Sequence, residues 1–315
     1  MKISPSWIRD FINPPVDDRK MAEDLTDTGT SIEGFSGQGK DLVYEAEVTT
    51  NRVDAMNHYG IAREVSAIYD LDLKTVAPRL LGEHPPSDFK IEIEDAQGCA
   101  RYTARIVRNV KVGPSPEYIV HRLELIDQRS ISNVADATNY VLNELGQPTH
   151  AFDLDKLQGG KIVVRRAREG EVLKTLDGVE RKLNKQDLVI ADAFRAVALA
   201  GIMGGFDTMI TEQTRNVLIE SAWFDPAAIR HTSRRLGMHT DASHRFERGS
   251  DFGLTPLACA RVAELVQQTA GGCAPSAHPV VEAEIDALAR RVERPQLHLR
   301  QREVQRILGL SLIHI

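Results

Sequence analysis

Segments with the period of a β-strand and segments with the period of an α-helix are interspersed along the whole of this 315-residue chain. Residues 89–94 (Phe-Lys-Ile-Glu-Ile-Glu) alternate between apolar and charged side chains, which is typical of a half-buried strand. Residues 257–270 instead place Ala258, Val262 and Leu265 at helical spacing before a pair of glycines. This mixture predicts a fold of the α+β class.

Two segments rich in glycine predict turns. Asp177-Gly178 divides residues 173–183 into the two strands of a hairpin, and this pair suits the positive φ angles of a type I′ turn. Residues 34–40 contain three glycines and predict a loop. The hairpin is the clearest local prediction in the chain.

The clearest domain boundary lies at residues 81–87, where two adjacent prolines interrupt all periodicity. We therefore expect a small N-terminal α+β domain at residues 1–85 and a larger mixed α/β domain at residues 86–284. Residues 285–315 are expected to form a linker and the start of a third domain.

Composition excludes several classes of protein. The chain has 39 basic and 45 acidic residues, which gives a net charge of -6, so any nucleic-acid site must be a local patch. No apolar run approaches the length of a membrane span, and no signal peptide opens the chain. Its three cysteines, Cys99, Cys259 and Cys273, form neither a disulfide framework nor a CxxC metal pair. We expect a cytoplasmic protein without membrane contact.

The densest polar cluster occupies residues 238–249, directly after a predicted helix. Three interpretations stay open on the residues alone. The cluster can be a solvated loop whose side chains bond their own backbone. It can hold a metal through His239, His244 and a third histidine upstream, although this spacing does not place the pair on one helix face. It can also present Ser243 or Thr240 as a nucleophile, although no G-x-S-x-G elbow surrounds either.

Other candidates lie apart from this cluster. Gly201 and Gly204 follow an apolar strand. They either make a plain turn or, because they lack side chains, let a ligand come close to the backbone. Glu220 ends an apolar strand, so its carboxylate is either buried with a partner or poised for a ligand. His150 is either a structural residue or a catalyst. From the residues alone, these features indicate a two-domain α+β protein with a polar cleft.

Six motifs occur in a fixed order along the chain. They are residues 1–8 (MKISPSWI), 49–54 (TTNRVD), 136–148 (DATNYVLNELGQP), 150–153 (HAFD), 200–205 (AGIMGG) and 239–249 (HTDASHRFERG). Together they resemble the beta subunits of bacterial phenylalanyl-tRNA synthetases, from the first residue to about residue 310.

The resemblance implies an α2β2 ligase that joins phenylalanine to tRNA(Phe) with ATP and Mg²⁺. In that family the alpha subunit ligates, and the beta subunit carries an editing domain that hydrolyses tyrosine misattached to the same tRNA. The implied partners are therefore the alpha subunit and tRNA(Phe), and residues 86–284 are implied to be the editing domain. No cofactor or metal is expected on this segment itself.

The resemblance also implies an editing pocket. Glu220 is assigned to the tyrosine hydroxyl, Gly201 and Gly204 leave room for the ring and the ester, and Ala242 keeps the cavity open. A site built to bond that hydroxyl rejects phenylalanine, because its own polar group is otherwise left unpaired.

Two further residues are implied in the hydrolysis itself. Thr240 and His150 are expected to bind the terminal ribose or to position the attacking water. Hydrolysis of an activated ester needs a held water more than a strong nucleophile. The alternative is a module that binds tRNA or the alpha subunit without chemistry.

The chain departs from the family in two places. The family usually carries an oligonucleotide-binding barrel in its N-terminal domain, and residues 34–40 are too short to hold one. The family also continues beyond residue 310, so we expect a truncated reading frame and doubt ligation by this chain alone.

Overall fold

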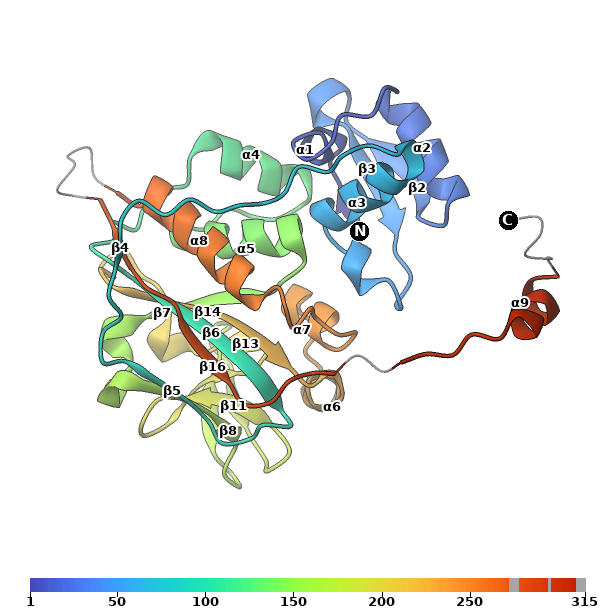
Figure 1. Cartoon of the computed structure of the whole chain (residues 1–315). Coiled ribbons are helices and arrows are strands. Elements are labelled where there is room, and N and C mark those ends of the chain that lie inside the picture. Colours follow the sequence, from blue (N-terminus) through green and yellow to red (C-terminus); the bar gives the residue numbers. More distant parts are fainter. Residues whose placement is uncertain (272–277, 294–295, 310–315) are drawn as a thin grey trace.

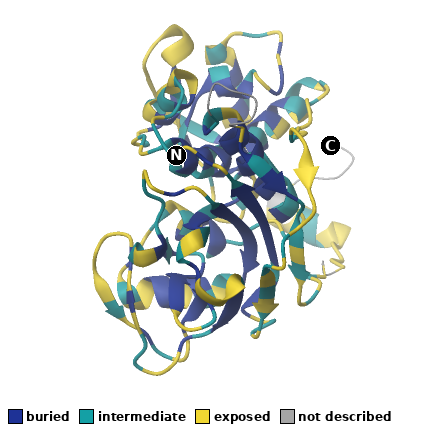
Figure 2. Cartoon of the chain, turned by 90° about the vertical axis from the view of Figure 1, so that its left-hand side faces the viewer, coloured by how far each residue is buried: buried dark blue, intermediate teal, exposed yellow. Residues whose placement is uncertain are grey.

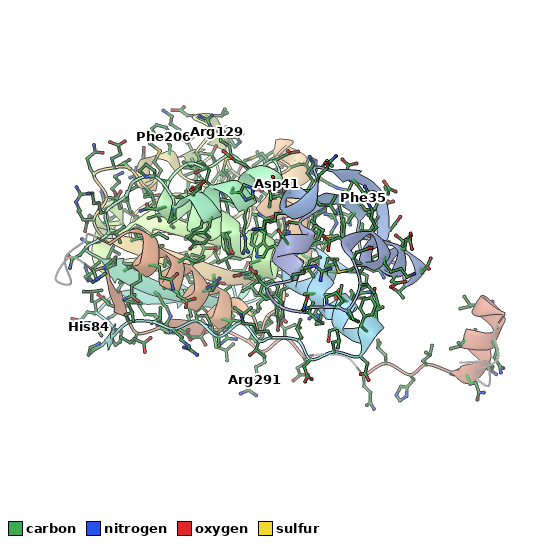
Figure 3. All side chains as sticks on the ribbon, turned by 90° about the horizontal axis from the view of Figure 1, so that it is seen from above. Phe35, Asp41, His84, Arg129, Phe206 and Arg291 are labelled. Atoms are coloured by element: carbon green, nitrogen blue, oxygen red, sulfur yellow. The ribbon has the colours of Figure 1, made fainter. Side chains whose placement is uncertain are left out.

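The computed structural model describes residues 1–271, 278–293 and 296–309. Two units lie side by side in Figure 1, a smaller one formed by the N-terminal residues and a larger one built on two sheets. Helices and strands are mixed in both, which confirms the predicted α+β class. Figure 3 shows Phe35 of the smaller unit far from His84, which lies on the opposite side of the larger unit.

The smaller unit is an antiparallel three-stranded sheet, in the order β1-β3-β2, covered by short helices. Its elements are β1 (Lys2–Ile3), α1 (Pro5–Ile8), α2 (Asp18–Asp27), β2 (Ser31–Ser36), β3 (Val43–Glu47) and α3 (His58–Tyr69). The prediction of a loop over residues 34–40 is wrong in its first half, because residues 34–36 belong to β2. Gly34 follows a bulge there, where an added Cβ would stand 2.9 Å from the Glu45 carboxylate.

The larger unit contains a six-stranded sheet in which the order is β4-β15-β6-β14-β7, and β16 also pairs with β6. Its strands are β4 (Glu83–His84), β6 (Cys99–Arg108), β7 (Thr149–Asp153), β14 (Val217–Phe224), β15 (Val280–Glu282) and β16 (Ile285–Leu288). The sheet therefore includes strands on both sides of the expected domain limits at residues 85 and 284. Main-chain pairing with β15 and β6 draws these short segments into it.

A second sheet of five strands, in the order β13-β12-β11-β8-β5, packs against one face of the first. Its strands are β5 (Lys90–Ile93), β8 (Lys161–Arg166), β11 (Leu188–Ala191), β12 (Ala196–Leu199) and β13 (Met203–Gly204). Helices cover the opposite face of the six-stranded sheet, so that β6 and β14 are buried on both sides (Figure 2). These helices are α4 (Glu117–Leu125), α5 (Asn133–Leu145) and α8 (Thr255–Thr269).

Strand alternation divides the apolar side chains into two cores. Along β14, Val217 and Ile219 point to the helices, whereas Leu218 and Ala222 point to the five-stranded sheet. The core on the helix side continues without a break into the smaller unit, where it includes Trp7. The two units thus share one apolar interior.

Three elements complete the chain. The hairpin β9 (Val172–Lys174) and β10 (Glu180–Lys182) lies where it was predicted, but its turn is not type I′. Only Gly178 has a positive φ, of 80°, since the Asp177 carboxylate bonds the turn from within and keeps that residue at negative φ. Helices α6 (Pro226–Leu236) and α7 (Asp241–Phe246) follow β14, and α9 (Gln301–Leu308) lies at the end of an extended segment (Figure 1).

Candidate active site

Five of the six predicted site residues line one cavity of about 70 Å³ between the two sheets. They are His150, Gly201, Gly204, Glu220 and Ala242. The cavity is enclosed by β7 and β14 on one side, by the turn between β12 and β13 on another, and by the first turn of α7. Residues that are up to 92 positions apart in the chain therefore meet at one place.

Glu220 and His150 are direct partners in the antiparallel pairing of β14 with β7. Glu220 is only 5% exposed, and its Oε2 has no hydrogen-bond partner among the described residues. Burial raises the pKa of Glu220 to about 8, and the nearby Tyr102 hydroxyl, which favours the ionised form, offsets only part of that shift. At neutral pH this carboxyl is largely protonated and can donate or accept a hydrogen bond.

The His150 ring lies against Gly204 of β13 at the cavity wall. It packs edge-on against Phe152, with ring centroids 4.5 Å apart, and its buried Nε2 has no partner in the described part of the chain. Burial lowers the pKa of His150 to about 4, so the imidazole is neutral at physiological pH. A neutral ring offers one donor and one acceptor, as is needed to hold a water molecule.

Close neighbours require glycine both at Gly201, in the turn between β12 and β13, and at Gly204, in β13. A Cβ on Gly204 would stand 2.4 Å from Cε1 of His150. Gly201 has a φ of 66°, and its Cβ would stand 2.9 Å from the Phe246 ring. The glycines therefore allow the turn to approach the wall of the cavity, in addition to leaving space within it.

Thr240 does not line this cavity. It is the N-cap of α7: its hydroxyl accepts a hydrogen bond from Ser243 N (3.0 Å) and donates one to Ile202 O (2.9 Å). Thr240 itself lines a larger cleft of about 870 Å³ on the other side of α7. Because Ile202 belongs to the cavity wall, Thr240 is placed to hold that wall against α7.

Half of the polar cluster at residues 238–249 forms helix α7, so its interpretation as a solvated loop is wrong for residues 241–246. Ser243 is fully buried, and its hydroxyl bonds the backbone of Thr240 in a capping box, which leaves no free nucleophile there. His239 and His244 are both exposed. Within the described ranges, no three His, Cys, Asp or Glu side chains are grouped so that they can hold a metal ion.

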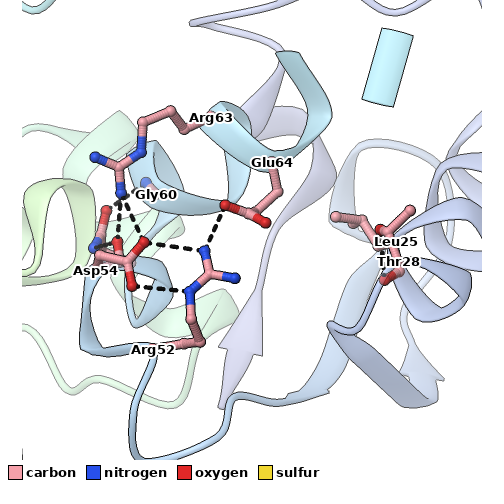
Figure 4. A network of polar contacts seen from close by, with 8 residues as sticks. Leu25, Thr28, Arg52, Asp54, Gly60, Arg63 and Glu64 are labelled. Carbon is pink, nitrogen blue, oxygen red and sulfur yellow. Dashed lines mark hydrogen bonds and ion pairs between the residues drawn. The ribbon is translucent and has the colours of Figure 1, made fainter. Parts of the chain in front are cut away.

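The motif at residues 49–54 builds a separate network in the smaller unit (Figure 4). Arg52 pairs with Asp54 (3.0 Å) and Glu64 (2.6 Å), and Arg63 also reaches Asp54 (3.2 Å). The Arg52 guanidinium is the main cause of the lowered pKa of Asp54. Gly60 allows this close packing, since a Cβ there would stand 2.0 Å from Asp54 O.

Tyr102 is a residue that the sequence did not indicate. It is fully buried on β6, and its hydroxyl lies near Glu220 without a hydrogen bond of full geometry. The only available signal was a tyrosine within an apolar strand, and that pattern is ordinary for a core residue.

Residues 98–271 match the family model described as the B3/4 domain, over more than half of the chain. This chain belongs to the B3/4 domain family. The B3/4 domain contains β6, β7, β14 and α7, and so all six predicted site residues.

Curated relatives extend the match into the smaller unit. The chain is 45% identical over 290 residues to a phenylalanine–tRNA ligase beta subunit from Geobacter metallireducens, a match that covers 91% of this chain and 36% of that protein. It is 48% identical over 274 residues to the corresponding subunit from Anaeromyxobacter dehalogenans, covering 86% and 34%. These matches confirm the resemblance predicted from the six motifs. The chain spans about a third of the length of these relatives.

Among solved structures, an N-terminal fragment of the phenylalanyl-tRNA synthetase beta subunit from Pyrococcus horikoshii aligns with 99% of this chain and 85% of that fragment. The TM-score is 0.43 and the sequence identity is 13%. No helix in the described part of the chain combines the length and the apolarity that crossing a bilayer requires.

Proposed function

We propose that this chain is the N-terminal part of a phenylalanine–tRNA ligase beta subunit whose B3/4 domain hydrolyses tyrosine misattached to tRNA(Phe). The observation that carries the proposal is the buried carboxyl of Glu220 at a small cavity, since its Oε2 has no hydrogen-bond partner among the residues that the structure describes. An unpaired buried polar group is costly, and a ligand hydroxyl would satisfy it.

The chemistry of selection supports tyrosine as the substrate. A pocket shaped for phenylalanine rejects an analogue with one added hydroxyl by only about 10²-fold. A second site that requires the hydroxyl removes the error, because phenylalanine would leave Glu220 without a partner. The cavity of about 70 Å³ has room for several water molecules, and this suits the hydroxyl end of a phenol ring, with the ribose outside.

Hydrolysis would then proceed without a protein nucleophile. Water attacks the ester carbon, the bond to the ribose oxygen breaks, and tyrosine and tRNA(Phe) leave. Neutral His150 would hold this water, since its Nε2 lies at the cavity wall and has no partner in the described ranges. Thr240 would act indirectly by fixing the wall through Ile202.

The partners and cofactors of a whole ligase are part of the same proposal. By likeness to the curated relatives, we propose that this segment works in the cytoplasm with an alpha subunit and tRNA(Phe). ATP and Mg²⁺ would serve ligation on the alpha subunit, and the hydrolysis proposed for the cavity requires neither.

The deciding experiment incubates the purified chain with tyrosyl-tRNA(Phe) and measures release of tyrosine, with phenylalanyl-tRNA(Phe) as the matched substrate. Selective release of tyrosine is expected. Glu220→Ala should reduce that selectivity, because the hydroxyl loses its partner while the cavity stays open. Binding of tRNA(Phe) without release of tyrosine would support a non-catalytic binding module instead.

Ala242→Trp tests the cavity itself. Ala242 lines the cavity, and an indole adds far more volume than about 70 Å³ can absorb. The substitution should abolish the release of tyrosine. The melting temperature should stay near that of the parent, because Ala242 is only half-buried and borders a cavity. Unchanged release by the folded variant would place the chemistry elsewhere.

A further inference from the structure

The turn of the β9–β10 hairpin is attached to the segment that carries Gly204, a residue of the cavity wall. Leu176 N donates a hydrogen bond to Gly204 O (3.0 Å), and Thr175 forms an isolated antiparallel bridge with Gly205. These contacts fasten residues 175–176 to residues 204–205, of which Gly204 lines the cavity. The tip of the hairpin is thereby held beside the candidate site.

Leu176 has its side chain at the edge of this site. A Cβ on Gly204 would stand 3.3 Å from Cδ1 of Leu176 and 2.5 Å from Nε2 of His150. Leu176 and the His150 ring therefore border the same small space, the one that a side chain at position 204 would occupy. Leu176 is also 40% exposed, so much of its apolar surface is free to be covered by a ligand.

The turn that carries Leu176 is braced by charge. The Asp177 carboxylate accepts hydrogen bonds from the Thr175 hydroxyl (2.7 Å) and from two nitrogens of Arg181 (2.8 and 2.7 Å). Arg181 also bonds the Thr175 hydroxyl, and together these bonds hold the pKa of Asp177 well below its usual range. A braced turn presents a side chain in a fixed position, as selection of a substrate requires.

We propose that Leu176 is a further specificity-determining residue of the editing site. Its side chain packs against the aminoacyl group at the mouth of the cavity and aligns that group so that the hydroxyl points inward to Glu220. This inference rests on the proposed function and deepens it, because the hairpin lies outside the set of six residues expected from the sequence.

Two substitutions and a matched control test the inference. Leu176→Ala should lower kcat/KM for tyrosyl-tRNA(Phe) about tenfold, mainly by raising KM, since roughly half of a leucine's apolar surface loses its contact. Leu176→Trp should close the mouth and abolish release of tyrosine. Val179→Ala alters the same turn at a side chain that is 50% exposed, and should leave kcat and KM unchanged. The melting temperature should stay within a few degrees in all three.

The outcomes separate the two proposals. If the parent chain releases tyrosine and Leu176→Ala matches both the parent and Val179→Ala, the role of Leu176 is overturned while the proposed function stands. If Val179→Ala is as harmful as Leu176→Ala, the effect comes from the turn as a whole, and the role of Leu176 is again overturned. If the parent chain itself releases no tyrosine, both proposals fall.

Discussion

At the scale of single residues, Glu220 couples stability to pH. Its pKa is about 8 in the folded chain against 4.5 for an ordinary glutamate, so between these values the folded state keeps a proton that the unfolded state has lost. The free energy of unfolding therefore falls as pH rises, by up to about 1.4 kcal/mol per pH unit. His150 acts in the opposite direction between about 4 and 6.5, where only the unfolded state takes up a proton.

His150 opposes the effect of Glu220 up to about pH 6.5, and from pH 6.5 to pH 8 it no longer offsets that effect. We predict that the parent chain loses about 2 kcal/mol of stability across this interval from Glu220. The Glu220→Gln variant has no carboxyl proton to release at this position, so its free energy of unfolding should not show this decrease between pH 6.5 and pH 8. Urea unfolding at pH 6.5 and pH 8 measures the free energy of unfolding of both proteins. An equal decrease in the parent and in the variant would contradict the prediction.

Two glycines with nearly the same backbone angle offer a second test at this scale. Gly201 and Gly237 have φ angles of 66° and 64°, but no atom of the described residues lies within 4 Å of a Cβ on Gly237, whereas one on Gly201 meets the Phe246 ring. Gly237→Ala should cost about 1–2 kcal/mol for the angle alone. Gly201→Ala should cost about 1–3 kcal/mol more, for overpacking. Equal midpoints in urea unfolding would show that the aromatic contact does not constrain position 201.

At the scale of elements, α7 depends on its capping residue. Thr240→Ala removes both the cap and the bond to Ile202, and should lower the free energy of unfolding by about 1–2 kcal/mol. Thr240→Ser keeps the hydroxyl and should stay within about 0.5 kcal/mol of the parent. Thermal unfolding followed by circular dichroism compares the three proteins. If serine is as harmful as alanine, the methyl group of Thr240 matters instead of its hydroxyl.

Elements with local signals are the ones that the sequence predicted well. Helix α6, the predicted helix that precedes the polar cluster, has an aspartate and proline at its start and a glycine at its end: Asp225 is its N-cap and Gly237 its C-cap. Helix α7 was missed, because six mostly polar residues carry no apolar period. The hairpin was predicted, but the conformation of its turn depends on the side-chain bonds of Asp177, which composition does not reveal.

The pairing between elements lay beyond sequence reasoning. Glu220 meets His150 only because β14 pairs with β7 in one particular register, across 70 positions of the chain. A shift of that register by one residue would turn Glu220 to the helix side of the sheet. The candidate site was therefore assembled from a family resemblance, and the periodicity of its strands alone did not unite it.

At the scale of the whole molecule, the shared core predicts joint unfolding of the two units. His58 of the smaller unit accepts a hydrogen bond from Ser4 N (3.0 Å), donates one to Asn143 O (2.8 Å) on α5, and stacks on Trp7. Burial lowers the pKa of His58 to about 3, so this link stays neutral across the physiological range. The smaller unit thus has both polar and apolar ties to the larger one.

Fluorescence offers a direct check of this coupling. The chain has two tryptophans, so Trp223→Phe leaves Trp7 as the only reporter, and it lies in the smaller unit. The unfolding transition seen by Trp7 should coincide with the one seen by far-ultraviolet circular dichroism. A Trp7 transition at clearly lower urea would show that the smaller unit unfolds independently.

The position of β6 in its sheet has a consequence for synthesis on the ribosome. One edge of β6 pairs with β14, and the other pairs with β15 and β16, which end at residue 288. After β6 has been synthesised, about 180 further residues must be added before its last partner strand is complete. At ordinary elongation rates this takes roughly ten to forty seconds. During that time an apolar edge is exposed as the nascent chain grows, and exposed edges recruit foreign strands. Chaperone binding to stalled chains should accordingly be strongest before residue 288 emerges.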